Sequence, residues 1–121
     1  MTVRPPRARP PLTLIVNSQE WHSRSLESIL GPHGHAVLRA YTGKQAIERA
    51  QSAHPDLIIL DSDLPDRDGF EVCRELRADP SVGAATPIIM TSPGHPSRVK
   101  RLEALRAGAW DFIGSALDGE E

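Results

Sequence analysis

The segment from residue 56 to residue 70, DLIILDSDLPDRDGF, constrains the fold more than any other part of this chain. Four apolar residues at 57–60 lead directly into the carboxylate of Asp61, and a proline and an Asp-Gly turn follow. A short apolar run between turn signals predicts a fully buried strand of the kind found in parallel sheets. Ligands bind outside the carboxyl ends of such strands, so Asp61 is expected at a functional site; the alternative is an aspartate that only caps the next turn.

Similar apolar runs and helix signals alternate along the rest of the sequence. Strands are predicted at 12–16, 35–40, 57–60, 87–91 and 109–113. Helices are predicted between them: one in the segment with His22, Leu26, Ile29 and Leu30, one after the N-cap Thr42, one over 70–78 and one after the N-cap Ser97. In the last of these helices, Val99, Leu102 and Leu105 are expected to form one face.

This alternation predicts an α/β fold with a doubly wound, five-stranded parallel sheet in the strand order 2-1-3-4-5. Right-handed connections then place helices on both faces of the sheet. Because the first and third strands are neighbours in this order, Asp61 is expected beside Asn17 and Ser18, which follow the first strand.

Length and composition favour one domain. The chain has 121 residues, of which 39% are hydrophobic, enough for a single core. No apolar stretch approaches the roughly 20 residues of a membrane helix, so no membrane insertion is expected. The single Cys73 cannot form an internal disulfide and lies in an apolar stripe, which predicts a buried thiol and fits a cytoplasmic location.

The two ends of the sequence differ from the middle. Residues 1–11 hold four prolines and three arginines without an acid, which predicts a disordered basic tail. Without those three arginines the net charge of −2 becomes −5, so the folded part is not expected to bind nucleic acid. After the fifth strand, Asp118 and Glu121 have capping-box spacing, which predicts the start of a helix. Most of this final helix is expected to be absent or truncated. We therefore expect a domain over 12–121 that belongs to a longer protein or is covered by a partner, a second copy included.

Taken together, the predicted units and three motifs resemble the receiver domain of bacterial response regulators, the CheY-like members of the flavodoxin-like fold. The motifs are DLIILDSDLPDRDGFEVCRELR, TPIIMTS and RAGAWDFI, and the resemblance extends over residues 12–117. It implies that Asp61 is the phosphoacceptor and that the backbone carbonyl of Asp63 is a magnesium ligand. It further implies that the Ser92 hydroxyl follows the phosphoryl group and that Phe112 is the switching aromatic residue.

The sequence departs from the family pattern at the charged positions around this acceptor. Asn17 and Ser18 replace the expected acidic pair, and Ser115 and Ala116 replace the expected lysine and proline. Phosphoryl transfer depends on a hard cation held by carboxylates and on a positive side chain. We therefore expect weak magnesium binding, through Asp61, Asp63 and Ser18 if at all. Glu20 and Asp66 are expected to face solvent, although either could supply a further carboxylate.

The resemblance implies a non-enzymatic signalling module of two-component or phosphorelay regulation. With its degenerate site, the domain is expected to act chiefly through protein contacts, with a sensor kinase or another signalling protein as partner and an output domain appended. The alternative is a working receiver that is phosphorylated on Asp61 with weakly held magnesium. On the fourth helix, Arg98, Lys100, Arg101 and Arg106 are expected to form a solvated face rather than a docking surface, and Trp110 is either an exposed anchor or packed over that helix.

Three other interpretations fit the sequence less well. Asp61 and Asp63 have the spacing of a haloacid-dehalogenase nucleophile and acid, but the later lysine and acidic pair of that class are missing. Asp66, Asp68, Gly69 and Glu75 match part of a calcium loop, yet its first ligand would be Leu64. His33 and His35 are expected to be turn residues, since no third metal ligand accompanies them.

Overall fold

The computed structural model describes residues 10–114, which alternate between strands and helices along the chain. The elements are β1 (Leu12–Val16), α1 (Glu20–Leu30), the short 3₁₀ helix η1 (Gly31–His33), β2 (Ala36–Ala40), α2 (Gly43–Ala53), β3 (Leu57–Asp61), α3 (Gly69–Ala78), β4 (Ile88–Ser92), α4 (Arg98–Arg106) and β5 (Asp111–Gly114). The predicted segments are therefore present. Most of the expected tail, in residues 1–9, and Ser115 and Ala116, in residues 115–121, lie outside the described residues.

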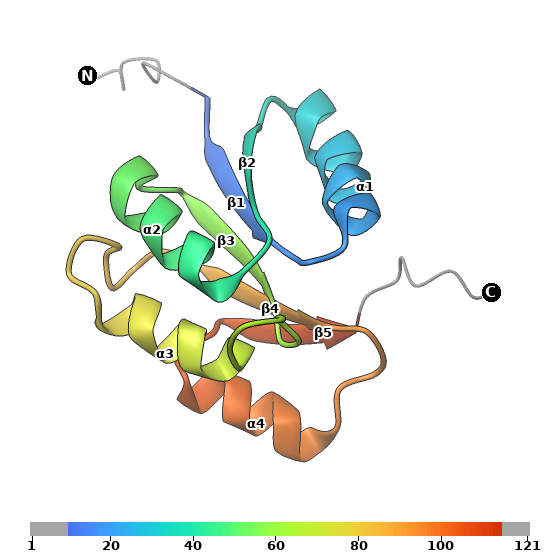
Figure 1. Cartoon of the computed structure of the whole chain (residues 1–121), viewed down its shortest axis with the longest axis vertical. Helices are drawn as coiled ribbons and strands as arrows, with labels where there is room; N and C mark the ends of the chain where they lie inside the picture. The colour runs from blue at the N-terminus through green and yellow to red at the C-terminus, as the bar shows by residue number, and fades with distance from the viewer. Residues whose placement is uncertain (1–9, 115–121) are drawn as a thin grey trace, which may run out of the picture.

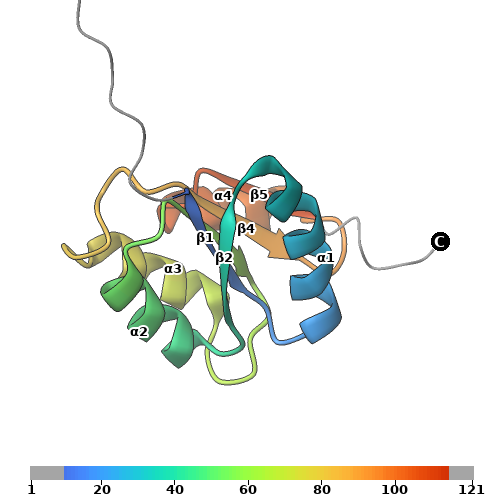
Figure 2. The ribbon, with the colours of Figure 1, turned by 90° about the horizontal axis from the view of Figure 1, so that it is seen from above.

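The five strands form one parallel sheet in the order β2-β1-β3-β4-β5, which confirms the predicted topology (Figure 1). Helix α1 lies on one face of the sheet, and α2 and α3 lie on the other (Figure 2). Register aligns Val16 of β1 with Leu60 of β3, so the residues that follow these two strands emerge side by side. The predicted proximity of Asn17 to Asp61 follows from this register.

The main core lies between the sheet and helices α2, α3 and α4. Alternate strand residues such as Ile58, Leu60 and Met90 are fully buried there, together with Leu76 of α3. Ile59, which points to the other face, is only partly buried. Strand β3 is thus less enclosed than its apolar run predicts, because α1 is the one helix that covers this second face within residues 10–114.

Helix α4 turns its large apolar side chains to solvent. Val99 is 74% exposed, Leu102 is 45% exposed and Leu105 is 44% exposed. The small Ala104 is fully buried and occupies the contact with the core instead. The expected apolar face exists, but it is an outward face.

Two further features of the fold concern single residues. Cys73 is fully buried, and burial raises the pKa of its thiol to about 11, so the thiol stays protonated. None of the helices between residues 10 and 114 is long and apolar enough to cross a lipid bilayer.

Candidate functional site

Asp61 ends β3 and lies at the carboxyl edge of the sheet, where its sequence context places it. The side chain is 8% exposed, and the register pairs Asp61 with Thr91 of β4. The Thr91 hydroxyl donates a hydrogen bond of 3.1 Å to Oδ1 of Asp61. Thr91 was not among the candidate site residues predicted from the sequence. Its position at the end of a strand that neighbours β3 could have indicated it.

The Asp61 carboxyl group titrates well above an ordinary aspartate. Burial disfavours the charged form and raises the pKa to about 6, while hydrogen bonds from Thr91 and from the backbone at Asp63 and Ser62 partly oppose that shift. A carboxylate with this pKa is still mostly ionised at neutral pH and can act as a nucleophile.

The raised pKa predicts how stability depends on pH. Folded protein binds a proton on Asp61 up to about pH 6, whereas unfolded protein releases it near pH 4, so stability falls as the pH rises through this window. Asp61→Asn removes the buried charge. We expect this variant to be more stable than the wild type by about 2 to 3 kcal/mol at pH 8 and about equally stable at pH 4. Urea unfolding at both pH values measures the difference, and a gain of equal size at pH 4 would contradict this account.

Asn17 follows β1 beside the end of β3, but its side chain bonds to residues close to it in the chain. It is 4% exposed, and its Oδ1 accepts a hydrogen bond of 2.8 Å from the backbone N–H of Gln19. Its Nδ2 lies 3.2 Å from Nδ1 of the buried His22. These bonds hold the turn from β1 into α1, while Ser18 is exposed.

The site offers few ligands for a hard divalent cation. Magnesium prefers carboxylate oxygens in near-octahedral geometry. Asp61 supplies one buried carboxylate, Asp63 is exposed, and the amide oxygen of Asn17 already accepts the Gln19 N–H. Across residues 10–114, no three His, Cys, Asp or Glu side chains gather in a group that could hold a metal ion. This donor set does not fit a tightly bound magnesium ion.

Glu20 and Asp66, the two further carboxylates considered as magnesium ligands, are engaged with other groups. Glu20 is exposed and pairs with Arg24 at 2.8 Å. Asp66 accepts hydrogen bonds from the backbone N–H groups of Gly43, at 2.8 Å, and Lys44, at 3.1 Å, which lower its pKa. Asp66 therefore stabilises the N-terminus of α2 and is directed away from Asp61.

The remaining candidate residues lie around the same edge of the sheet. The Ser92 hydroxyl donates to the carbonyl of Gly94 and is not the hydroxyl on the Asp61 carboxylate. Phe112 is 1% exposed and packs edge-on against Phe70, with ring centroids 5.6 Å apart. Asp63 is exposed and forms a backbone bridge with Asp68. Trp110 is 59% exposed, which favours the exposed of its two predicted placements.

The calcium-loop residues serve the fold instead. Asp68 caps α3 by accepting the N–H of Phe70 at 2.9 Å, and the carboxylate of Asp66 caps α2. Leu64, in the place of the first ligand, is buried. Ring nitrogen Nδ1 of His35 lies 3.3 Å from the Thr13 hydroxyl, and His33 is exposed.

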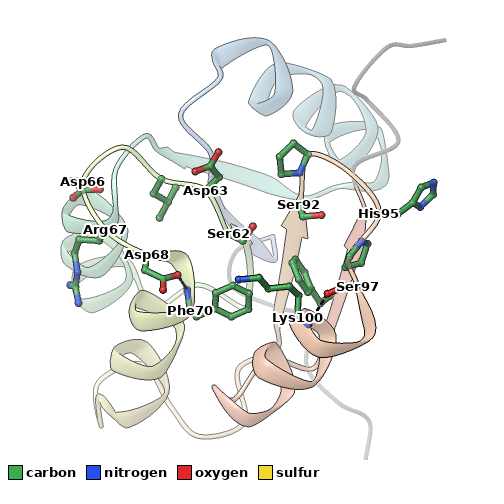
Figure 3. Close-up of a pocket in the computed structure, with 14 residues that line it drawn as sticks. Ser62, Asp63, Asp66, Arg67, Asp68, Phe70, Ser92, His95, Ser97 and Lys100 are labelled. Carbon is green, nitrogen blue, oxygen red and sulfur yellow. Dashed lines mark hydrogen bonds between the residues drawn. The ribbon is translucent and has the colours of Figure 1, made fainter.

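A cleft of about 820 Å³ opens next to the carboxyl end of β3, between the β3–α3 and β4–α4 loops (Figure 3). Ser62, Asp63 and Ser92 line it on the strand side, and Lys100 of α4 lines it on the helix side. The volume is in the range of small-ligand sites.

Comparison with known proteins decides the family. The family model described as "Response regulator receiver domain" matches residues 13–120. The chain belongs to this family. Protein PilH of Pseudomonas aeruginosa is 30% identical to this receiver domain over 107 residues, which are 88% of this chain and 87% of PilH. Chemotaxis response regulator CheY4 of Vibrio cholerae has a similar structure, with a TM-score of 0.82, 27% identity and coverage of 89% and 88% of the two chains.

Other relatives are longer than this receiver domain. Response regulator PleD of Caulobacter vibrioides is 34% identical over 105 residues, which are 87% of this chain and 23% of PleD. The chain thus spans about a quarter of that protein. A protein-glutamate methylesterase/protein-glutamine glutaminase of Alkalilimnicola ehrlichii is 36% identical over 104 residues, 25% of its length. Receiver domains are signalling modules that typically bind magnesium at an acidic site, and in these relatives the domain is one part of a larger protein.

Proposed function

We propose that this receiver domain signals chiefly through protein contacts in phosphorelay-type regulation, and that Asp61 accepts a phosphoryl group only slowly. The main support for this proposal is the neutral side chain of Asn17. Where the family pattern has an acidic residue, its amide is bonded to the N–H of Gln19 and to His22. A neutral amide in this position cannot supply the charge that a hard cation requires.

The expected rate follows from the missing charges. Metal assistance to phosphoryl transfer is worth several kcal/mol, and each 1.4 kcal/mol corresponds to a factor of ten. Slowing by on the order of a thousandfold relative to receivers with the acidic pair is therefore expected. We infer weak magnesium binding through Asp61, Asp63 and Ser18, a sensor kinase or other signalling protein as partner, an appended output domain and a cytoplasmic location.

The test is incubation with acetyl phosphate and magnesium, followed by intact-protein mass measurement over time. We expect a slow, substoichiometric gain of one phosphoryl group that is absent from Asp61→Asn. Rapid and stoichiometric modification would refute the proposal. It would favour the alternative, a working receiver in which Asn17 and Ser18 orient magnesium. The position of the Asp61 carboxyl group at the end of β3 and its bond to Thr91 support this alternative.

A further inference from the structure

Lys100 is one of the basic side chains that line the cleft next to β3. The cleft is lined by Ser62 and Asp63, the two residues that follow Asp61, and by Ser92 at the end of the neighbouring strand. In Figure 3 the Lys100 side chain extends from α4 to the Phe70 ring, where its ammonium group ends in the cleft that Ser62 also lines. A positive charge is thus present beside the carboxyl ends of β3 and β4.

The first turn of α4 positions the Lys100 side chain. The Ser97 hydroxyl accepts a hydrogen bond of 3.1 Å from the N–H of Lys100, which sets the first turn of the helix at the rim of the cleft. Side chains in a helix lean toward its N-terminus, and here that direction leads into the cleft. The ammonium nitrogen lies 5.3 Å from the centroid of the Phe70 ring.

Gly69, which precedes Phe70 in α3, lies directly against the end of β3. The N–H of Gly69 donates a hydrogen bond of 3.1 Å to the carbonyl of Ser62. A Cβ atom on Gly69 would be only 2.5 Å from the backbone oxygen of Asp61. Helix α3 therefore begins in contact with the end of β3, and Lys100 lies over the ring of the second residue of that helix.

Competing ion pairs leave Lys100 available. Its ammonium group lies 3.8 Å from Glu103, and the two side chains are 59% and 40% exposed, so this pair contributes little. Arg67, another basic residue of the cleft, pairs instead with Glu75 at 2.9 Å and with Glu71 at 3.9 Å. A phosphoryl group with a charge of about −1.5 to −2 is a stronger partner than one exposed carboxylate, and the flexible lysine stem can follow it.

We propose that Lys100 is the cation that binds the phosphoryl oxygens when Asp61 is phosphorylated. This inference rests on the proposed function, because it takes Asp61 as the acceptor. In the transfer, a carboxylate oxygen of Asp61 attacks the phosphorus of acetyl phosphate, the bond from phosphorus to the acetate oxygen breaks, and acetate leaves with the electron pair. Lys100 transfers no proton and neutralises charge on the equatorial oxygens.

The experiment compares initial rates of phosphorylation by acetyl phosphate, measured by intact mass at fixed magnesium. Lys100→Ala and Lys100→Gln are expected to slow modification of Asp61 about tenfold, and Lys100→Arg is expected to retain most of the rate. Arg101→Ala is the matched control: it removes the same charge one residue away, from a side chain that pairs with Asp111 at 3.4 Å and is not part of the cleft lining. Circular dichroism melting verifies that each variant is folded.

Each outcome bears on one of the two proposals. A tenfold loss in Lys100→Ala and Lys100→Gln, with Arg101→Ala close to the wild type, supports the assignment of Lys100. Equal rates in all variants, equal losses in the Lys100 and Arg101 variants, or a wild type that gains no phosphoryl group at Asp61 would overturn it. Fast, magnesium-dependent modification of the wild type would refute slow acceptance by Asp61, while the ratio between the Lys100 and Arg101 variants would still report on Lys100.

Discussion

The double variant Asn17→Asp with Ser18→Asp is expected to be phosphorylated on Asp61 about a thousandfold faster than the wild type. The two new carboxylates would stand beside Asp61, because the register places the ends of β1 and β3 next to each other. Together with Asp61 they would supply the charges that a magnesium ion requires. Intact mass during incubation with acetyl phosphate measures the rate, with and without chelator.

Magnesium binding by the same variant can be followed separately. The Trp21 ring lies 4.0 Å, centroid to centroid, from the ring of His22, whose Nδ1 contacts Asn17, so Trp21 fluorescence should report on the site. Trp110→Phe removes the second tryptophan signal. Ser18→Asp alone is the control, since it adds a carboxylate at an exposed position and leaves the Asn17 bonds in place. If the double variant binds magnesium tightly but is phosphorylated no faster, missing acidic residues are not what limits transfer.

Replacing Gly69 by alanine is expected to destabilise the domain by about 3 kcal/mol or more. The added Cβ would lie 2.5 Å from the carbonyl oxygen of Asp61, 2.6 Å from the Cα of Ser62 and 2.8 Å from its carbonyl oxygen. These are backbone atoms, which cannot rotate away as a flexible side chain can. The strain must therefore move α3 away from β3 or unfold part of the domain, and urea unfolding measures the loss.

Gly94→Ala provides a matched control for this substitution. A Cβ atom at Gly94 has no neighbour within 4 Å, and Gly94 is not among the glycines with a positive φ. We expect a stability within about 0.5 kcal/mol of the wild type, with a small gain from the reduced freedom of the unfolded chain. Similar losses in both variants would show that the contact between Gly69 and the end of β3 is not the cause.

The sequence was sufficient to predict the strands, the helices and their order in the sheet. Short apolar runs separated by helical periodicity leave a parallel, doubly wound sheet as the main solution, since parallel strands need long connections. The same reasoning placed Asp61 at the edge of the sheet and Asn17 next to it. Local signals also located two helix starts: Thr42 and Ser97 each accept a hydrogen bond from a backbone N–H in the first turn of their helix.

Side-chain direction within the site could not be predicted in the same way. The sequence did not indicate that the register pairs Asp61 with Thr91 or that the Thr91 hydroxyl contacts the carboxylate, while the role expected of Ser92 toward a phosphoryl group stays a prediction. Successive strand residues point to opposite faces, so a shift of one position changes which hydroxyl meets the acid. The outward apolar stripe of α4 was likewise invisible, because periodicity does not say which stripe meets the core when the small Ala104 can do so.

By itself, then, the sequence determined the α/β topology, the place of Asp61 at the end of a buried strand and the absence of an acidic pair beside it, because these depend on residue types and on periodicity along the chain. Only the tertiary structure decided that Asn17 is engaged with His22, that Asp66 caps a distant helix and that Lys100 extends over Phe70 into the cleft. These contacts join residues far apart in the chain or depend on rotamers, and their geometry is set by how helices pack on the sheet rather than by any local pattern.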